Sequence, residues 1–246
     1  GWQRKSMERF MEIEEDSMGL YNRQLEKDNC GFGLMAHIDG EASHKLVRTA
    51  MSSLARMAHR GGIAADGKTG DGCGLLLQRP DNFFHSLAGE EGWNLGGRYG
   101  VGMIFLSPDE AIATVAKWAI EEELERETLT VVAWRDVPVD PEVLGDFARK
   151  TMPRIVQVIF NGPFGWGSKD LERRLYMVRR RVEKRITDDP DFYIASLSNL
   201  VIVYKGLCQP VDLPLFFPDL ADIRMQSAIC LFHQRFSTNT LPKWSL

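Results

Sequence analysis

The sequence predicts a layered α/β protein, because apolar runs of strand length alternate along the chain with longer segments whose apolar residues recur at helical spacing. The first run covers residues 31–38 and is closed by Asp39-Gly40, so we expect a buried strand there. No internal repeat and no low-complexity tract interrupts the alternation. Strands and helices that alternate in this way favour stacked layers over a helix bundle or a barrel.

A helix is expected after the first strand. Apolar residues recur at helical spacing from residue 46 to residue 58, and Ser43 stands where an N-cap would lie. The helix should end at His59-Arg60-Gly61-Gly62, where two glycines stop it and allow a tight loop. The glycine-rich segment 70–74 then leads into a second buried strand over residues 75–77.

The middle of the chain continues the alternation. After a strand over residues 100–106, Ser107 reads as an N-cap, with Pro108 at the first helical position and Glu110 completing a capping box. This helix should run to about Arg126. The remaining elements expected there are a strand over 129–134, a helix over 141–152 and a strand over 155–160.

The last third predicts one long helix and three strands. Residues 169–186 place an apolar stripe on one helical face, formed by Leu171, Leu175, Val178, Val182 and Ile186. This helix is basic, with eight Lys or Arg against three acids up to Thr187, but no aromatic stacking platform accompanies it. A solvated helix face is therefore favoured over RNA binding. The strands are expected over 192–198, 200–205 and 227–232.

Composition and charge exclude several classes of protein. The 246 residues are 44% apolar, enough for one large domain or two small ones, and the formal charge of -4 offers no general attraction to nucleic acid or to an anionic membrane. No apolar run approaches the length of a membrane span and no secretory signal begins the chain, so we expect a cytoplasmic protein. The four cysteines contain no C-x-x-C pair and suggest no zinc or iron–sulfur site.

Cys30 marks an abrupt change in character. Residues 1–29 are charged, rich in Met and without sustained periodicity, which is typical of a leader. Cleavage of the Asn29–Cys30 bond would leave a thiol and a free α-amine in one residue at the start of a buried strand. An α-amine has a pKa of about 7.7–8.0 and a thiol about 8.5, so the amine can accept the thiol proton near neutral pH. Taken alone, a cysteine in this setting is more often an ordinary core residue.

Three separated blocks decide between these two interpretations. They are Cys30-Gly31-Phe32-Gly33-Leu34, then the segment from Ala58-His59-Arg60-Gly61 through Asp66 to Gly74, and finally Phe232-His233-Gln234-Arg235-Phe236-Ser237-Thr238-Asn239-Thr240. In this order they resemble the N-terminal class II glutamine amidotransferase domain of bacterial glutamate synthase large subunits. The resemblance covers essentially all of residues 20–246. It implies the four-layer αββα sandwich of the N-terminal nucleophile (Ntn) hydrolases, with residues 1–29 as a propeptide and 30–246 as the amidotransferase domain.

The resemblance also implies roles for five residues. The thiolate of Cys30 would attack the side-chain amide of L-glutamine, release ammonia and leave a thioester that water hydrolyses to L-glutamate. Arg235 would pair with the substrate α-carboxylate. Thr238 would hydrogen-bond the amino-acid end of the substrate, Phe236 would form a wall of the pocket, and Arg60 would lie near the nucleophile.

The other reactive side chains are expected to be structural. The mechanism needs no imidazole, so His59 and His233 are interpreted as structural residues. Apolar surroundings favour Cys73, Cys208 and Cys230 as inert core thiols.

No cofactor is expected in this segment, although the resemblance implies further parts for a longer enzyme. These are a barrel domain with FMN and an iron–sulfur cluster that passes ammonia to 2-oxoglutarate, and a small NAD(P)H-oxidising subunit. The Asn-Gly pair that supplies the oxyanion hole in this family follows the segment matching 233–246, so we expect an incomplete domain with weak glutaminase activity or none.

Two alternatives stay open. One is a catalytically incompetent fragment or split-gene subunit that acts as a binding module. The other is a different class II amidotransferase, which the long insertion between Gly70–Gly74 and Arg235 disfavours.

Overall fold

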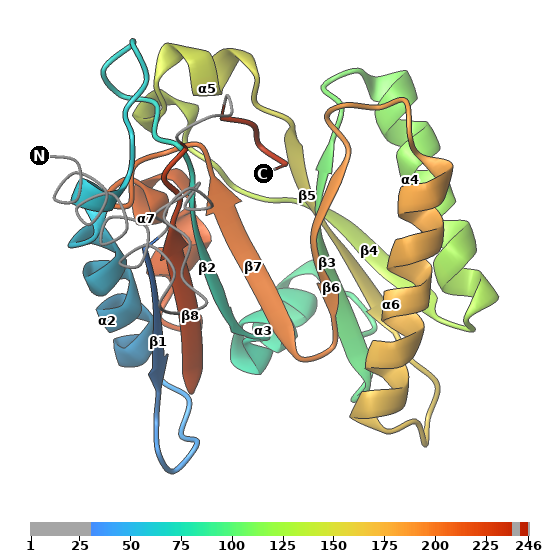
Figure 1. The fold of residues 1–246 in the computed structure, drawn as a ribbon. Coiled ribbons are helices and arrows are strands. Elements are labelled where there is room, and N and C mark those ends of the chain that lie inside the picture. The colour runs from blue at the N-terminus through green and yellow to red at the C-terminus, as the bar shows by residue number, and fades with distance from the viewer. Residues whose placement is uncertain (1–30, 238–241, 246) are drawn as a thin grey trace, which may run out of the picture.

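The computed structural model describes residues 31–237 and 242–245. Two of the residues that the sequence singles out, Cys30 and Thr238, lie outside this range, as does the leader 1–29. The described residues form two four-stranded sheets in which all paired strands are antiparallel, with helices packed against them (Figure 1). This mixed α/β architecture is consistent with the Ntn-hydrolase sandwich that the sequence predicts.

The first sheet brings together strands from opposite ends of the chain. Its order is β1-β8-β2-β7. The strands are β1 (Gly31–Ala36), β8 (Ile229–Gln234), β2 (Cys73–Gln78) and β7 (Val201–Gly206). Because β8 lies between β1 and β2, residues near 234 are placed beside the start of β1 and the start of β2.

The second sheet is built from the middle of the chain, in the order β4-β5-β3-β6. The strands are β4 (Thr130–Asp136), β5 (Arg154–Asn161), β3 (Tyr99–Leu106) and β6 (Tyr193–Ser198). The tight turn Asn199-Leu200 leads directly from β6 into β7 of the first sheet. Ser198 Oγ accepts the N–H groups of Leu200 at 2.9 Å and Val201 at 3.1 Å, which satisfies the donors that the turn exposes.

Two long helices, α4 (Glu110–Arg126) and α6 (Ser168–Arg185), lie side by side on one face of the second sheet (Figure 1). The stripe expected on α6 is buried against the sheet at Leu171, Leu175, Val178 and Val182. Ala113, Ala116, Ile120 and Leu124 of α4 complete the same core cluster. No helix of the described residues is long and apolar enough to cross a membrane.

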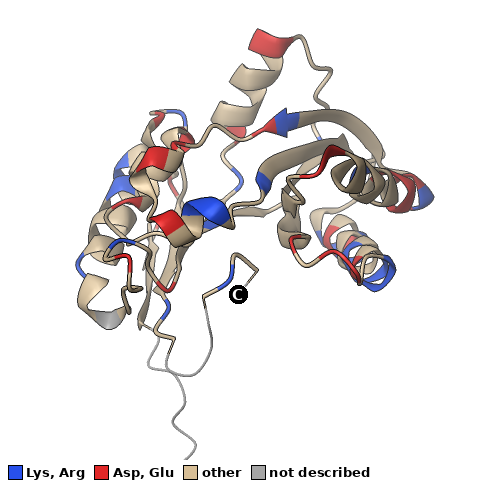
Figure 2. Cartoon of the chain, turned by 90° about the horizontal axis from the view of Figure 1, so that it is seen from above, with Lys and Arg blue, Asp and Glu red and all other residues tan. Residues whose placement is uncertain are grey.

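Several basic residues of α6 pair with acids at the C-terminal end of α4. Arg181 and Arg174 both bind Glu127, at 2.5 and 2.8 Å, and Arg185 binds Glu122 at 2.6 Å. Seen from above, basic and acidic residues lie together on these two helices (Figure 2). The interpretation of a solvated face is therefore incomplete, because part of its charge is used to join α6 to α4.

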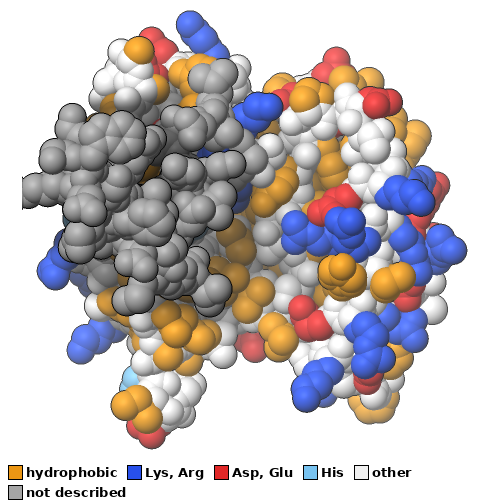
Figure 3. Space-filling view, viewed as in Figure 1, with side chains coloured by type: hydrophobic (Ala, Val, Ile, Leu, Met, Phe, Trp, Pro, Cys, Tyr) orange, Lys and Arg blue, Asp and Glu red, His pale blue; other side chains and the backbone are white. Residues whose placement is uncertain are grey.

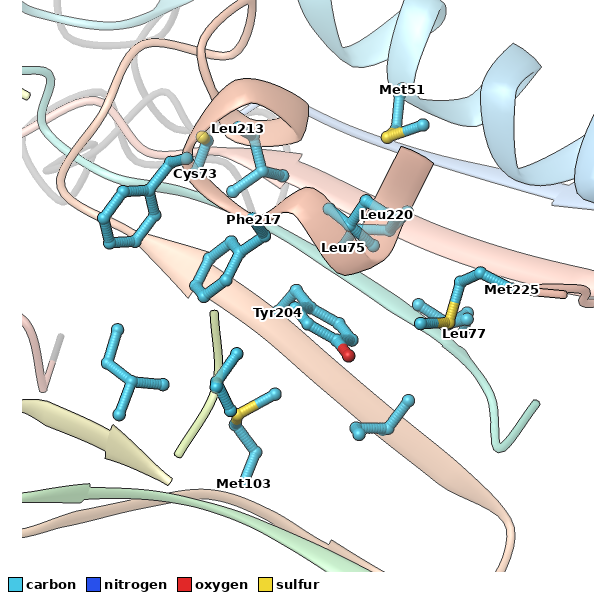
Figure 4. Packing of buried hydrophobic residues seen from close by; sticks show 14 of the residues in the cluster. Met51, Cys73, Leu75, Leu77, Met103, Tyr204, Leu213, Phe217, Leu220 and Met225 are labelled. Carbon is cyan, nitrogen blue, oxygen red and sulfur yellow. The ribbon is translucent and has the colours of Figure 1, made fainter. Parts of the chain in front are cut away.

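The larger core cluster is shared by both sheets and several helices. Among these helices are α2 (His44–Ala55), α3 (Asp81–Glu91) and the short α7 (Leu213–Phe216). Tyr204 of β7 lies between Phe217, whose ring centroid is 5.1 Å away, and Met103 of β3 (Figure 4). A continuous apolar core therefore connects the two sheets.

One face of the first sheet packs into the larger core cluster, and its other face carries exposed apolar side chains. Phe32 is 76% exposed, and Leu34, Ile229 and Leu231 are also exposed. Figure 3 shows hydrophobic side chains gathered over β1 and β8 on the face toward the viewer. Large apolar side chains on a sheet face cost free energy in water, so this face has the character of a packing surface.

Helix starts test the capping predictions. Ser43 caps α2 as expected, since its Oγ accepts the N–H of Leu46 at 3.2 Å. The prediction for α4 was wrong by two residues. Asp109 is the N-cap, accepting from Ala111 at 2.9 Å and from Ile112 at 3.2 Å, whereas Ser107 accepts only the N–H of Asp109. A carboxylate that reaches two N–H groups replaces the expected serine.

The prediction of a single helix over residues 141–152 was also wrong. The structure has a 3₁₀ turn, η3 (Pro141–Val143), and a separate short α5 (Asp146–Lys150). Leu144 and Gly145 between them are extended, and Gly145 lies so close to Thr69 that a Cβ would approach its Oγ1 to 2.3 Å. Packing against the 63–70 loop therefore interrupts the helix. Helix α3 and the turns η2 (Ala58–Arg60) and η4 (Pro218–Ala221) were not anticipated.

A buried ion pair joins the second sheet to the segment that covers the first. Arg135 of β4 donates two hydrogen bonds to Asp219, at 2.8 and 2.7 Å, and a third to Gln157 at 2.9 Å. Tyr204 donates to the same carboxylate at 3.0 Å. Burial lowers the pKa of Arg135, but the hydrogen bonds and charge of Asp219 outweigh it and raise this pKa above its usual value. Both charges are thus kept in the interior.

We expect Asp219→Ala to lower the free energy of unfolding by about 3–5 kcal/mol, because it leaves the Arg135 charge buried without its partner. Asp136→Ala is the matched control, since this neighbouring carboxylate is exposed and its pairing with Arg154 contributes at most about 1 kcal/mol. Urea denaturation of both variants measures the difference. Equal losses in the two variants would contradict the assignment of the Arg135 pair as a structural link.

Candidate active site

The start of β1 lies against the end of β8. Gly31, which directly follows Cys30 in the chain, pairs with Gln234, and Gln234 in turn pairs with Cys73 at the start of β2. Further along β1, the close packing of Phe232 requires a glycine at position 33, because a Cβ on Gly33 would lie 2.4 Å from the ring of Phe232. The sheet register therefore brings the second and third sequence blocks next to the residue that follows Cys30.

Backbone hydrogen bonds hold the third block on the second. The N–H of Arg235 donates to the carbonyl of Gly72 at 2.9 Å, immediately after the last pair of the β2–β8 ladder. Gly72 has φ of 117°, a conformation that favours glycine. The turn before β2 thus directs the carbonyl of Gly72 toward the N–H of Arg235, and this hydrogen bond fixes the backbone position of Arg235.

Asp71 lies at the centre of this contact and is only 7% exposed. One oxygen, Oδ2, accepts the N–H of Gly62 at 3.0 Å and the N–H of Ser237 at 2.7 Å. A carboxylate that accepts two N–H groups forms charge-assisted hydrogen bonds, which are stronger than neutral ones. Asp71 therefore connects the loop after α2 to the segment that follows β8.

The His59-Arg60-Gly61 turn packs directly on β8. A Cβ at Gly61 would lie 1.8 Å from Nε2 of Gln234, so only glycine allows this approach. Gln234 is 1% exposed, and its Nε2 donates to the carbonyl of Arg235 at 3.2 Å. The backbone of Arg60 is thereby placed beside the Arg235 segment, while its side chain lies outside what the structure describes.

The neighbouring loop 63–70 is organised by Asp66. Its carboxylate accepts the N–H groups of Lys68, Thr69 and Phe147 and the hydroxyl of Thr69. The hydrogen bond from the Thr69 hydroxyl, followed by those from the backbone, holds the pKa of Asp66 well below its ordinary value. This loop enters β2 with a conformation set by hydrogen bonds rather than by apolar burial.

A group of basic side chains lies on one cross-strand row of the first sheet. Gly74 pairs with Lys205 on one side and with His233 on the other, and a Cβ at Gly74 would contact both. Burial, followed by the nearby charge of Arg235, lowers the pKa of Lys205 to about 8. Burial, followed by the charges of Lys205 and Arg235, lowers the pKa of His233, so this imidazole is neutral at pH 7.

The described cysteines are buried. Sγ of Cys73 lies 3.8 Å from Sγ of Cys208, and this hydrogen-bonding contact, together with burial, raises the pKa of Cys208 well above its usual value. Burial raises the pKa of Cys230 to about 11. Thiols with raised pKa values form little thiolate near neutral pH, as expected of inert core residues. Within residues 31–237 and 242–245, no three His, Cys, Asp or Glu side chains gather to hold a metal.

A family described as glutamine amidotransferases class-II matches residues 30–246, which begin at the cysteine that opens the first block. The chain belongs to the class II glutamine amidotransferases.

Relatives of this amidotransferase are glutamate synthases. The chain is 41% identical over 235 residues to the glutamate synthase [NADPH] large chain of Bacillus subtilis, an alignment that covers 93% of this chain and 15% of that protein. It is 39% identical over 223 residues to the ferredoxin-dependent glutamate synthase 2 of Synechocystis, with 90% and 14% covered. The large chain from Azospirillum brasilense is 37% identical over 230 residues, with 92% and 15% covered. The chain thus spans about 15% of the length of these relatives.

The structure brings together some of the site residues that the sequence predicts. Arg235 and Phe236 follow β8 beside the Gly61–Gly62 and Asp71–Gly72 loops, whereas Cys30, Thr238 and the side chain of Arg60 lie outside the described part. Asp71 lies within the second sequence block, between Asp66 and Gly74, but the sequence pattern predicts no separate role for it. A carboxylate between two glycines, close before a buried strand, was the available signal.

The low pKa of Lys205 predicts a pH dependence of stability. In the unfolded amidotransferase Lys205 keeps its proton to about pH 10.5, whereas in the native state it loses it near pH 8. The unfolded state therefore binds more protons in this window, and the contribution of Lys205 to the free energy of unfolding rises as pH increases from about 8 to 10.5. Lys205→Met should remove this rise. Urea denaturation of both proteins across this range measures it, and parallel pH curves would contradict the prediction.

Proposed function

We propose that this amidotransferase hydrolyses L-glutamine to L-glutamate and ammonia, with Cys30 as the nucleophile. One observation carries the proposal. The backbone of Arg235 is bonded to Gly72 one residue beyond the pair that Gln234 forms with Gly31, the residue after Cys30. The backbone of Arg235 therefore lies near the start of β1, the strand that Cys30 precedes. In the proposal, the guanidinium of Arg235 binds a carboxylate of the substrate.

The proposed chemistry requires removal of residues 1–29. The new α-amine of Cys30 accepts the thiol proton, and the thiolate sulfur attacks the side-chain amide carbon of glutamine. The amide nitrogen takes up a proton and leaves as ammonia, and water then cleaves the thioester to give glutamate and the free thiol. No histidine is required, because the α-amine of Cys30 is itself the base.

The remaining site residues bind the amino-acid part of the substrate in this proposal. Arg235 pairs with the α-carboxylate through two parallel N–H groups. Thr238 hydrogen-bonds the same end, Phe236 forms an apolar wall and Arg60 lies near the nucleophile.

We extend the proposal to a longer protein because the chain covers about 15% of glutamate synthase large chains. Ammonia passes there to 2-oxoglutarate in a part of the enzyme that holds FMN and an iron–sulfur cluster, with reducing equivalents from a small NAD(P)H-oxidising subunit. The reaction takes place in the cytoplasm. None of these cofactors is assigned to residues of this chain.

Covalent labelling tests the nucleophile. A glutamine-mimicking diazoketone should modify Cys30 once residues 1–29 are removed, and intact mass should show one adduct per chain. Cys30→Ala should lose the adduct and any glutamine-dependent release of ammonia, because the three cysteines of the described residues are buried. Cys230→Ala is the control and should label like the wild type. Turnover or labelling that persists in Cys30→Ala would rule out this nucleophile, and a protein that binds glutamine without labelling would favour the binding module.

Arg235→Lys tests substrate recognition. Lysine keeps the positive charge but cannot form two parallel hydrogen bonds to a carboxylate, so KM for glutamine should rise about 10-fold or more with a smaller change in kcat. Arg224→Lys is the matched control, since Arg224 pairs with Asp222 and Glu90 on the surface. Steady-state ammonia release measures both. A KM that does not change in Arg235→Lys would argue against binding of the α-carboxylate by this residue.

A further inference from the structure

Asp71 connects two loops of the candidate site through the hydrogen bonds of its carboxylate. Its Oδ2 accepts the N–H of Gly62 and the N–H of Ser237, which belong to segments separated by about 175 residues in the chain. Its own N–H donates to the carbonyl of Gly62 at 3.2 Å. Asp71 thus fastens the loop after α2 on one side and the segment after β8 on the other.

The neighbouring glycines make room for this carboxylate. A Cβ at Gly62 would lie 2.6 Å from Oδ2 of Asp71, so the close approach requires glycine at this position. Gly72, on the other side of Asp71, takes the positive φ that turns its carbonyl toward Arg235. The geometry of the whole segment is therefore arranged around the two hydrogen bonds of one oxygen atom.

The segment from Arg235 to Ser237 is held by a hydrogen bond of a backbone N–H at each end. Its own N–H is bound by Gly72, and two residues later the N–H of Ser237 is bound by Asp71. The backbone of Arg235 and Phe236 is held at both ends before any substrate is present. A segment that is ordered in advance loses less conformational freedom when a ligand binds, which raises affinity.

We propose that Asp71 is a positioning residue for glutamine, which acts by holding the segment 235–237 in its binding conformation and does not touch the substrate. The inference rests on the function proposed above, and it adds a residue that the mechanism does not use. Both hydrogen bonds of its Oδ2 are made to backbone N–H groups, so its effect on glutamine passes through the backbone.

The experiment compares Asp71→Ala, Asp71→Asn and Asp109→Ala in the protein. Asp109 is a matched control, because its carboxylate also accepts two backbone N–H groups, at 2.9 and 3.2 Å, but at the start of α4. The measurements are KM and kcat for glutamine, the melting temperature, and hydrogen exchange of the Ser237 amide.

Asp71→Ala should raise KM about 10–100-fold with a change in kcat below about threefold, and should increase exchange at Ser237 about 10-fold or more. Asp71→Asn keeps an oxygen that can accept both N–H groups, and it should return KM to within about threefold of the wild type. Asp109→Ala should lower the melting temperature and leave KM unchanged.

Three results would overturn the proposal. They are a wild-type KM in Asp71→Ala, an equal rise of KM in Asp109→Ala, or an Asn variant as impaired as the Ala variant, since the last would mean that the negative charge itself acts on the substrate. The exchange measurement separates this proposal from the glutaminase. If the wild type neither hydrolyses glutamine nor labels at Cys30, Ser237 exchange still reports whether Asp71 holds the segment, and an unchanged rate in Asp71→Ala overturns it.

Discussion

The fold depends on the buried pairing of Arg135 with Asp219. A charge in the interior is tolerated only when its hydrogen-bonding groups are satisfied, and here Gln157 and Tyr204 contribute the bonds that the two ions cannot make to each other. These residues come from the second sheet, from the first sheet and from the turn that covers the core. Apolar contact alone would allow the sheets to slide, because hydrophobic attraction has no preferred direction. The two hydrogen bonds between Arg135 and Asp219 do have a preferred direction, and they restrict the position of the second sheet relative to the turn that covers the core.

This link reaches the candidate site through β7. Tyr204 holds that strand at the junction of the sheets, and one cross-strand row then runs across the first sheet from Gly206 through Cys73 and Gln234 to Gly31. Each step of the row is set by the register of two adjacent strands. The loop before β2 ends at Cys73 and the segment after β8 begins at Gln234, and these two residues pair in the row, so the separation of the two loops is determined by the register of the sheet. The site therefore depends on a rigid sheet, while the residues proposed to bind substrate lie on the loops attached to it.

Much of the fold could be predicted from the sequence, because strand runs and helical stripes are local signals that the core then uses. The strands, the cap at Ser43 and the apolar face of α6 are of this kind. The interrupted helix near Gly145 and the capping role of Asp109 could not be, since the first depends on contact with Thr69 and the second on a choice between two good caps. The family blocks predicted Arg235 and Phe236 as site residues, and this stays a prediction. The role of Asp71 was not recognised, because it appears only when Gly62 and Ser237 are adjacent in space.

The place of β8 between β1 and β2 has a consequence for biosynthesis. On emerging from the ribosome, β1 has no partner, because it lies at the edge of the described sheet and pairs there with β8, which is synthesised much later. Roughly 190 residues must be added first, which takes on the order of 10–40 s at the usual rate of translation. During this interval the strand that follows Cys30 stays unpaired and the Arg235 segment does not yet exist. The order of synthesis therefore delays assembly of the site until the chain has almost reached its last described residue.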